Sequence, residues 1–187
     1  MTENPSAASA RAPAKVGGSV AIVGAAVAAL AVFTIPQEGN VSIPYRDGGG
    51  VWTDCIGHTS GVKPTDRPTP AQCHAFYVAD MTAAMTSALR VTSSLAQHPG
   101  PLKAVGDLVF NSGVGHYTGS PMSAAFGRGQ WAAGCNAFAG YLTLYKAPKP
   151  VPGHRCVFNK AHVLYCEAGG LVTRRLGEKK LCLSGIR

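Results

Sequence analysis

Acidic residues are scarce in this chain of 187 residues: nine Asp and Glu stand against seventeen Lys and Arg, which gives a formal net charge of +8. From Lys146 onward there are nine basic residues and only two acidic ones. A surface with this excess of positive charge attracts polyanions, whether nucleic acid, acidic lipid or an anionic cell-wall glycan, and the charge alone does not indicate which of them is bound. The same composition is also explained by a basic surface that is only solvated and binds no partner.

Cofactor motifs are also missing. Neither standard Gly-rich phosphate loop occurs, and no two cysteines have the C-x-x-C spacing of a zinc site. Cys55 and His58 would supply half of a metal site, but no second half follows, so we expect no metal and no cofactor. The six cysteines all lie after residue 50, and such an even, dispersed set is typical of disulfides formed in an oxidising compartment.

Charge is absent from residues 16–37. Residues 1–15 are polar and rich in Ala, Ser and Pro, and we expect them to form a disordered cytoplasmic tail. Residues 16–35 would span about 30 Å as a helix, which is the thickness of a bilayer core. Because basic residues precede this segment, we expect a cytoplasmic N-terminus and export of the domain formed by residues 36–187.

The uncharged segment is only weakly hydrophobic, since Gly and Ala fill much of it. It can therefore insert into a membrane but gains little free energy by remaining there. Two alternatives stay open: a cleaved signal peptide with Ala29-Leu30-Ala31 as its processing site, and a buried helix of a soluble domain. We favour an uncleaved anchor.

Three of the nine acids, Glu38, Asp47 and Asp54, lie within seventeen positions. Gly39 suits the left-handed end of a helix, and the glycines at 48–50 suit a hairpin turn, which places Glu38 at a helix end and Asp47 at a hairpin. Two carboxylates on different elements across a cleft suit glycoside hydrolysis, in which one donates a proton and the other stays ionised. Spacing alone is weak evidence, because acids are common on surfaces.

A longer pattern strengthens this interpretation: Glu38, eight residues, Asp47, five residues, Thr53. Further characteristic stretches are Gly50-Val51-Trp52-Thr53, Cys55-Ile56-Gly57-His58-Thr59, Phe110-Asn111-Ser112-Gly113-Val114-Gly115 and Gly170-Leu171-Val172-Thr173-Arg174-Arg175. In these motifs the chain resembles the phage-type lysozymes, glycoside hydrolase family twenty-four, over roughly residues 36–185. The weak membrane segment in front resembles the signal-anchor-release segment of some lambdoid endolysins.

The resemblance implies roles for individual residues. Glu38 would be the general acid, Asp47 the carboxylate that activates or positions the attacking water, and Thr53 the hydroxyl that holds this water. A hydroxyl can do so because it both donates and accepts hydrogen bonds. A structural pair and three glycan contacts are implied as well: His58 with Asp80, and Thr59, Phe110 and Ser120.

The implied fold is α+β and lysozyme-like, with a small β-hairpin lobe facing a larger helical lobe and an N-terminal membrane helix. Thr69, Pro70 and Gln72 form a capping-box pattern that begins a helix running to about Gln97. Shorter helices are expected at about 102–112, 121–128, 130–145 and 170–183. We interpret residues 145–166 as an inserted loop closed by Cys156 and Cys166, with Cys55–Cys73 a weaker prediction among fifteen possible connectivities.

The function implied is that of an endolysin, which hydrolyses the β-1,4 bond between N-acetylmuramic acid and N-acetylglucosamine with inversion during host lysis. Expected partners are peptidoglycan glycan strands, the host inner membrane and, indirectly, a holin or pinholin that collapses the membrane potential. We expect a monomer that binds no nucleic acid, on the exported face of the inner membrane and then in the periplasm. Two alternatives remain: a lytic transglycosylase, and a non-catalytic wall-binding module tethered to the membrane.

Overall fold

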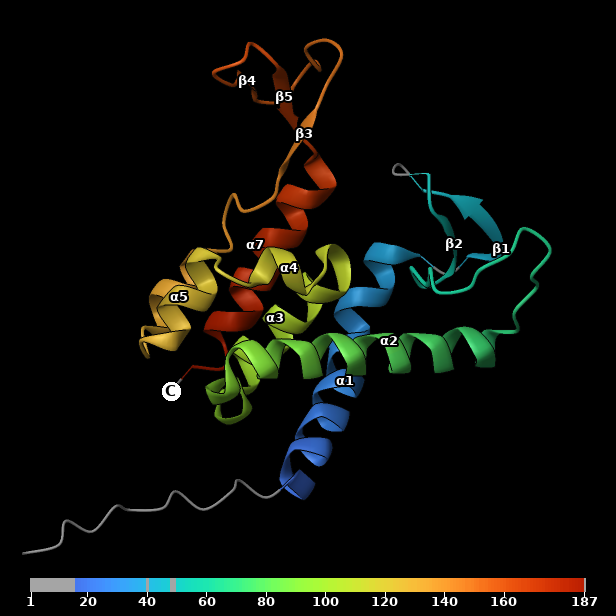
Figure 1. Ribbon diagram of the computed structural model, residues 1–187, viewed down its shortest axis with the longest axis vertical. Coiled ribbons are helices and arrows are strands. Elements are labelled where there is room, and N and C mark those ends of the chain that lie inside the picture. The colour runs from blue at the N-terminus through green and yellow to red at the C-terminus, as the bar shows by residue number, and fades with distance from the viewer. Residues whose placement is uncertain (1–15, 40, 48–49, 187) are drawn as a thin grey trace, which may run out of the picture.

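The computed structural model describes residues 16–39, 41–47 and 50–186 (Figure 1). The expected tail at 1–15 lies outside them. The helices are α1 (Val16–Glu38), α2 (Pro70–Val91), the 3-10 helix η1 (Ser93–Gln97), α3 (Pro99–Ser112), α4 (Val114–Tyr117), α5 (Pro121–Gly127), α6 (Trp131–Asn136) and α7 (Gly169–Leu183). The strands are β1 (Val41–Arg46), β2 (Trp52–Cys55), β3 (Leu144–Lys146), β4 (Cys156–Phe158) and β5 (Leu164–Glu167).

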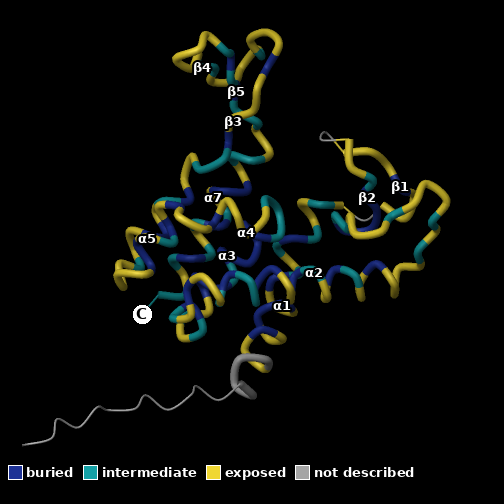
Figure 2. The backbone as a smooth tube through the Cα atoms, viewed as in Figure 1, coloured by how far each residue is buried: buried dark blue, intermediate teal, exposed yellow. Residues whose placement is uncertain are grey.

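Helix α3 is the centre of the helical body. Nine of its fourteen residues are buried, and α1, α2 and α7 all pack against it (Figure 2). Gly106 allows α2 to approach closely, because a Cβ there would lie 2.7 Å from the side chain of Met85. Charged groups on such a helix need partners, since an unpaired buried charge is very unfavourable. Asp107, which is fully buried on α3, is therefore held by hydrogen bonds from neighbouring helices.

Helix α1 contributes one apolar stripe to this core. The buried apolar side chains recur at helical spacing, namely Val23, Ala26, Val27 and Leu30, and the buried polar residue Thr34 continues the same face. The opposite side of the helix is exposed although it is apolar, and Val32 is 82% exposed. The helix runs three residues past Ile35, so it ends at Glu38. The division of the chain between residues 35 and 36 stays a prediction.

Helix α2 begins as expected but ends early. The Thr69 hydroxyl accepts a hydrogen bond from the Gln72 amide at 3.3 Å, and the Gln72 side chain accepts one from the Thr69 amide at 2.8 Å, which completes the capping box. The expected end at Gln97 is wrong. The helix stops at Val91 because Thr92 leaves helical geometry, and the Thr92 hydroxyl accepts a hydrogen bond from buried Tyr117 at 2.8 Å.

The chain forms two small antiparallel sheets in its described part. Strands β1 and β2 form the hairpin that follows α1, with Tyr45 opposite Thr53. The inserted segment is a three-stranded sheet in the order β3-β5-β4, rather than a loop, and it projects from the helical body (Figure 1). The helix expected at 130–145 is also wrong: α6 ends at Asn136, and the positive φ values of Gly140 and Leu142, 79° and 51°, are incompatible with a helix that continues to residue 145.

Three disulfides join these elements. Both expected pairs are present: Cys55–Cys73 links the hairpin to α2, and Cys156–Cys166 links β4 to β5. The third, Cys135–Cys182, ties α6 to α7 across 47 residues of sequence. No spacing argument selected it, since the two residues meet only through helix packing.

Candidate active site

Glu38 lies at the C-terminal end of α1, where the chain turns into the hairpin. Gly39 follows with φ +75°, and its amide donates to the Ile35 carbonyl at 3.0 Å, as expected for a glycine that ends a helix. The Glu38 side chain is 19% exposed. Its carboxyl group is therefore largely enclosed by protein but still reaches the surface.

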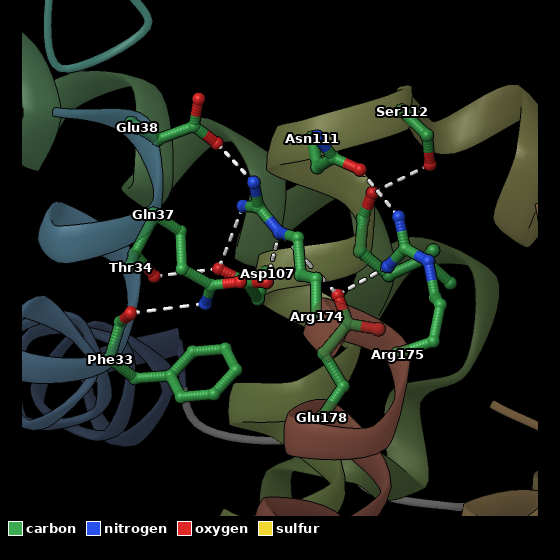
Figure 3. Close-up of polar contacts among 11 residues, drawn as sticks. Phe33, Thr34, Gln37, Glu38, Asp107, Asn111, Ser112, Arg174, Arg175 and Glu178 are labelled. Carbon is green, nitrogen blue, oxygen red and sulfur yellow. Dashed lines mark hydrogen bonds and ion pairs between the residues drawn. The ribbon is translucent and has the colours of Figure 1, made fainter. Parts of the chain in front are cut away.

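A buried network holds one oxygen of this carboxyl group (Figure 3). Arg174 of α7 donates through Nη1 to Glu38 Oε1. The same guanidinium donates to both oxygens of Asp107, from Nε at 2.8 Å and from Nη2 at 3.0 Å. Thr34 of α1 donates to Asp107 Oδ1 at 2.6 Å. Burial lowers the pKa of Arg174, but the Asp107 and Glu38 carboxylates outweigh burial and raise this pKa, which keeps the guanidinium charged.

A tight turn after the hairpin lies against the other oxygen of Glu38. Gly57 has φ +73°, and a Cβ built on it would lie 3.2 Å from Glu38 Oε2. The turn is closed by backbone hydrogen bonds between Asp54 and His58, at 2.9 and 3.0 Å. The expected pair of His58 with Asp80 is present at 2.6 Å and anchors the turn to α2. Glu38 thus sits between Arg174 and the Gly57 backbone.

Asp47 and Thr53 both lie on the hairpin. Asp47 directly follows β1, and its carboxylate accepts a hydrogen bond from the Val51 amide at 2.8 Å, which helps to close the hairpin loop. Thr53 of β2 is 4% exposed, and its hydroxyl donates to the Val51 carbonyl at 3.2 Å, so that its oxygen can still accept. Figure 1 shows the hairpin beside the C-terminal end of α1, which carries Glu38.

A groove of about 270 Å³ is lined in part by Gly57, whose backbone lies against Glu38, whereas Glu38, Asp47 and Thr53 are not among its lining residues. Thr59 and Phe110, two of the expected glycan contacts, line this groove. Ser120 does not line it: its side chain is buried, and its hydroxyl accepts a hydrogen bond from the Ser123 amide at 3.1 Å as the N-cap of α5. Among the described residues, no three His, Cys, Asp or Glu side chains are placed to hold a metal ion.

A second buried network lies next to the first on α7. Arg175 donates to Glu178 Oε1 and to Asn111 Oδ1 on α3. Burial raises the pKa of Glu178 to about 9, Arg175 lowers it and Asp107 adds to the rise. Glu178 Oε1 also lies 3.8 Å from Arg174 Nε, so the second network meets the first at Glu178.

Sequence reasoning included Arg174 only as part of a motif and overlooked Thr34 and Asp107. A signal was present for both. Asp107 is a lone acid within an apolar helix, and a buried carboxylate must have a partner. Thr34 is a polar residue in an uncharged segment, four positions before Glu38 and thus on the same helix face.

Comparisons with known proteins agree on one family. The family described as Phage lysozyme matches residues 36–155. A SAR-endolysin of Pseudomonas phage phiKMV is 30% identical over 163 residues, which are 86% of this chain and 89% of the relative. The match covers most of this chain and most of the relative, so the similarity is not confined to one motif.

Solved structures share the fold. The active form of P1 phage endolysin Lyz is 22% identical with a TM-score of 0.64, over 94% of this chain and 97% of that one. The muramidase domain of SpmX from Asticaccaulis excentricus is 16% identical with a TM-score of 0.63, over 92% and 99%. A mutant of P22 lysozyme is 20% identical with a TM-score of 0.55, over 85% and 95%. These similarities confirm the lysozyme-like α+β fold.

Proposed function

The chain belongs to the phage lysozyme family and is a peptidoglycan-hydrolysing endolysin, and we propose that Glu38 and Asp47 are its catalytic carboxyl groups. The bond cleaved is the β-1,4 link between N-acetylmuramic acid and N-acetylglucosamine. One observation carries the assignment of Glu38: its carboxyl group lies between the Arg174 guanidinium and Gly57, and Gly57 lines the groove that contains Thr59 and Phe110.

The chemistry needs an acid in a fixed position next to a bound sugar. Glu38 meets this requirement because one oxygen is held and the other faces a turn that borders the groove. In the proposed reaction Glu38 gives its proton to the glycosidic oxygen, and water attacks the anomeric carbon. Asp47 takes the proton of this water while the Thr53 hydroxyl orients it, so that the configuration inverts and a reducing end is released.

The assignment is tested with Glu38→Gln and Asp47→Asn, since neither amide can exchange the required proton. We expect both variants to fold and to lose nearly all turbidity-clearing activity on permeabilised cells. Glu167→Gln is the matched control, because Glu167 pairs with Arg155 on the projecting sheet. Near-normal lysis by Glu38→Gln would contradict the assignment. Mass spectrometry of the glycan products separates the alternatives, because a transglycosylase leaves anhydro ends and a binding module leaves no product.

We further propose that residues 16–35 anchor the enzyme in the host inner membrane and later join the folded enzyme as most of α1. Residues Ala21–Glu38 are long and apolar enough to cross a membrane by length and composition, with a mean hydropathy of 1.6. The side of α1 that faces away from the core supports both roles, in the membrane and in the folded enzyme, because it is apolar and uncharged although it is exposed. Cleavage at Ala31 would remove Val23, Ala26, Val27 and Leu30 from the core, which argues against a signal peptide.

Anchoring also explains control of activity. While α1 lies in the membrane, Glu38 is held at the lipid surface and cannot complete its contact with Arg174. Collapse of the membrane potential by a holin or pinholin then frees the segment, and the enzyme acts in the periplasm as a monomer on glycan strands, without a nucleic acid partner. The Gly and Ala content keeps the free energy of remaining in the membrane small, which makes this release feasible.

Gly24→Leu tests release without disturbing the fold. Nothing lies within 4 Å of a Cβ at Gly24, so the folded enzyme accommodates the side chain, while the membrane segment becomes more apolar. We expect more protein in the membrane fraction after the potential is dissipated, and unchanged kcat for the enzyme recovered in soluble form. Gly24→Ser is the matched control. Soluble protein whose N-terminal sequence begins near Val32 would show a cleaved signal peptide and overturn this proposal.

A further inference from the structure

We infer that Thr34 and Asp107 are positioning residues for Glu38, which fix the last turn of α1 and the Arg174 guanidinium in a single arrangement. Both side chains are fully buried, so neither can touch a glycan. Their effect must therefore pass through Arg174 and Glu38. The inference rests on the proposed role of Glu38 as the acid, and the experiment below separates the failure of one from the failure of the other.

The last turn of α1 needs support from outside the helix. Pro36 lies inside this turn and has no amide hydrogen, so the usual bond to the carbonyl four residues earlier is missing. Glu38 is the final helical residue, where backbone carbonyls also lack partners within the helix. A carboxyl group at such an end is poorly fixed unless other elements hold it.

Thr34 supplies the first point of attachment. Its hydroxyl donates to Asp107 Oδ1 on α3 at 2.6 Å, and both groups are shielded from water. Thr34 precedes Glu38 by four residues, so the two side chains project from the same face of α1. The bond therefore fixes the rotation of the face that presents the acid.

Arg174 supplies the second point of attachment, and Asp107 determines its orientation. The Asp107 carboxylate accepts from Nε and Nη2, and because the guanidinium is planar and rigid, these two bonds fix where Nη1 points. Nη1 points at Glu38 (Figure 3). A closed ring results. Hydrogen bonds join Thr34 to Asp107, Asp107 to Arg174 and Arg174 to Glu38, and one turn of α1 connects Glu38 back to Thr34.

Breaking this ring should affect turnover more than substrate binding. A misplacement of about 1 Å can reduce the rate about a hundredfold, and loss of one of several bonds displaces the acid less than that. We expect Thr34→Val to lower kcat roughly tenfold with KM changed less than about twofold. Thr34→Ser keeps the hydroxyl and should restore most of the activity.

The measurement uses full-length enzyme purified in soluble form and purified peptidoglycan, so that release from the membrane plays no part. Thr92→Val is the matched control: Thr92 is also buried, and its hydroxyl also has a buried partner, Tyr117. We expect both valine variants to lose thermal stability and only Thr34→Val to lose kcat. Equal kcat values for Thr34→Val and Thr92→Val would overturn the inference.

A double-mutant cycle with Asp107→Asn provides a second, independent measurement. The amide cannot accept from Thr34 and from both nitrogens of Arg174, so we expect kcat to fall at least as far as in Thr34→Val. Because both changes break one ring, their effects should not multiply in the double variant. Independent, multiplying effects would overturn the inference. If Glu38→Gln remained active, the assignment of Glu38 as the acid would be wrong. If Glu38→Gln were inactive while Thr34→Val kept full kcat, the acid assignment would stand and only the positioning role of Thr34 would be wrong.

Discussion

Arg174 and Arg175 are neighbours in the sequence, lie on the same helix and are both buried, yet they serve different parts of the molecule. Arg174 reaches Asp107 on α3 and Glu38 on α1. Arg175 reaches Glu178 on its own helix and Asn111 on α3. The two networks meet at Glu178, which lies 3.8 Å from Arg174 Nε, but only the hydrogen bonds of Arg174 extend to the helix that carries the proposed acid (Figure 3).

The reason for the difference is helical geometry. With about 3.6 residues per turn, consecutive side chains project about 100° apart, so two adjacent arginines meet largely different partners. Glu178 is near both, because it lies four residues after Arg174 and three after Arg175 on the same helix. The comparison shows that burial and charge do not by themselves identify a residue that supports catalysis. We propose that what matters is whether the hydrogen bonds of the residue reach the element that carries Glu38. This distinction can be tested on both arginines with the same substitution.

The largest expected effect is that of Arg174→Lys against Arg175→Lys. Lysine keeps the charge but cannot bond Asp107 through two nitrogens while also reaching Glu38, so we expect kcat to fall about a hundredfold. Arg175→Lys should reduce the melting temperature but leave kcat within about threefold of the wild type. Kinetics on purified peptidoglycan and thermal denaturation check both, with circular dichroism to confirm folding. Equal losses of kcat in the two variants would erase the proposed difference.

A smaller effect is expected when Glu38 is disturbed from its opposite side, where neither arginine is touched. Gly57→Ala places a methyl group 3.2 Å from Glu38 Oε2 in a turn with φ +73°, and we expect kcat to fall about tenfold. Gly61→Ala is the control, because Gly61 has φ +72° and nothing within 4 Å of its Cβ. The control should show the same backbone strain and normal kcat. If the two alanine variants behaved alike, strain rather than displacement of Glu38 would explain the loss.

The smallest effect concerns the Arg175 network and appears in stability as a function of pH. Since burial raises the pKa of Glu178 to about 9 from an ordinary value of 4.5, the folded state holds this proton more tightly than the unfolded state does. The stabilisation that this tighter proton binding gives to the folded state is complete below about pH 4.5 and is lost as the pH rises toward 9. We expect the melting temperature to fall over this range by a few degrees more in the wild type than in Glu178→Gln. Glu167→Gln, which removes an acid on the projecting sheet, should keep the wild-type slope.

Local features of the fold were predictable from the sequence because their causes lie within a few residues. Gly39 indicated the end of a helix, and the capping box at Thr69 indicated the start of another. The errors have tertiary causes. Helix α2 ends at Val91, where the Thr92 hydroxyl meets Tyr117, a partner 25 residues away in sequence.

The candidate site likewise has features with local causes in the sequence and features with tertiary causes. The sequence by itself determined the family, through the spacing of Glu38, Asp47 and Thr53, and with it the expectation of a helix end next to a hairpin. Only the tertiary structure decided which buried groups hold the acid, because Arg174 lies 136 residues from Glu38 and 67 from Asp107 along the chain. No local pattern encodes such a meeting: it depends on how α1, α3 and α7 pack, and a buried charge then takes the partner that this packing brings within reach.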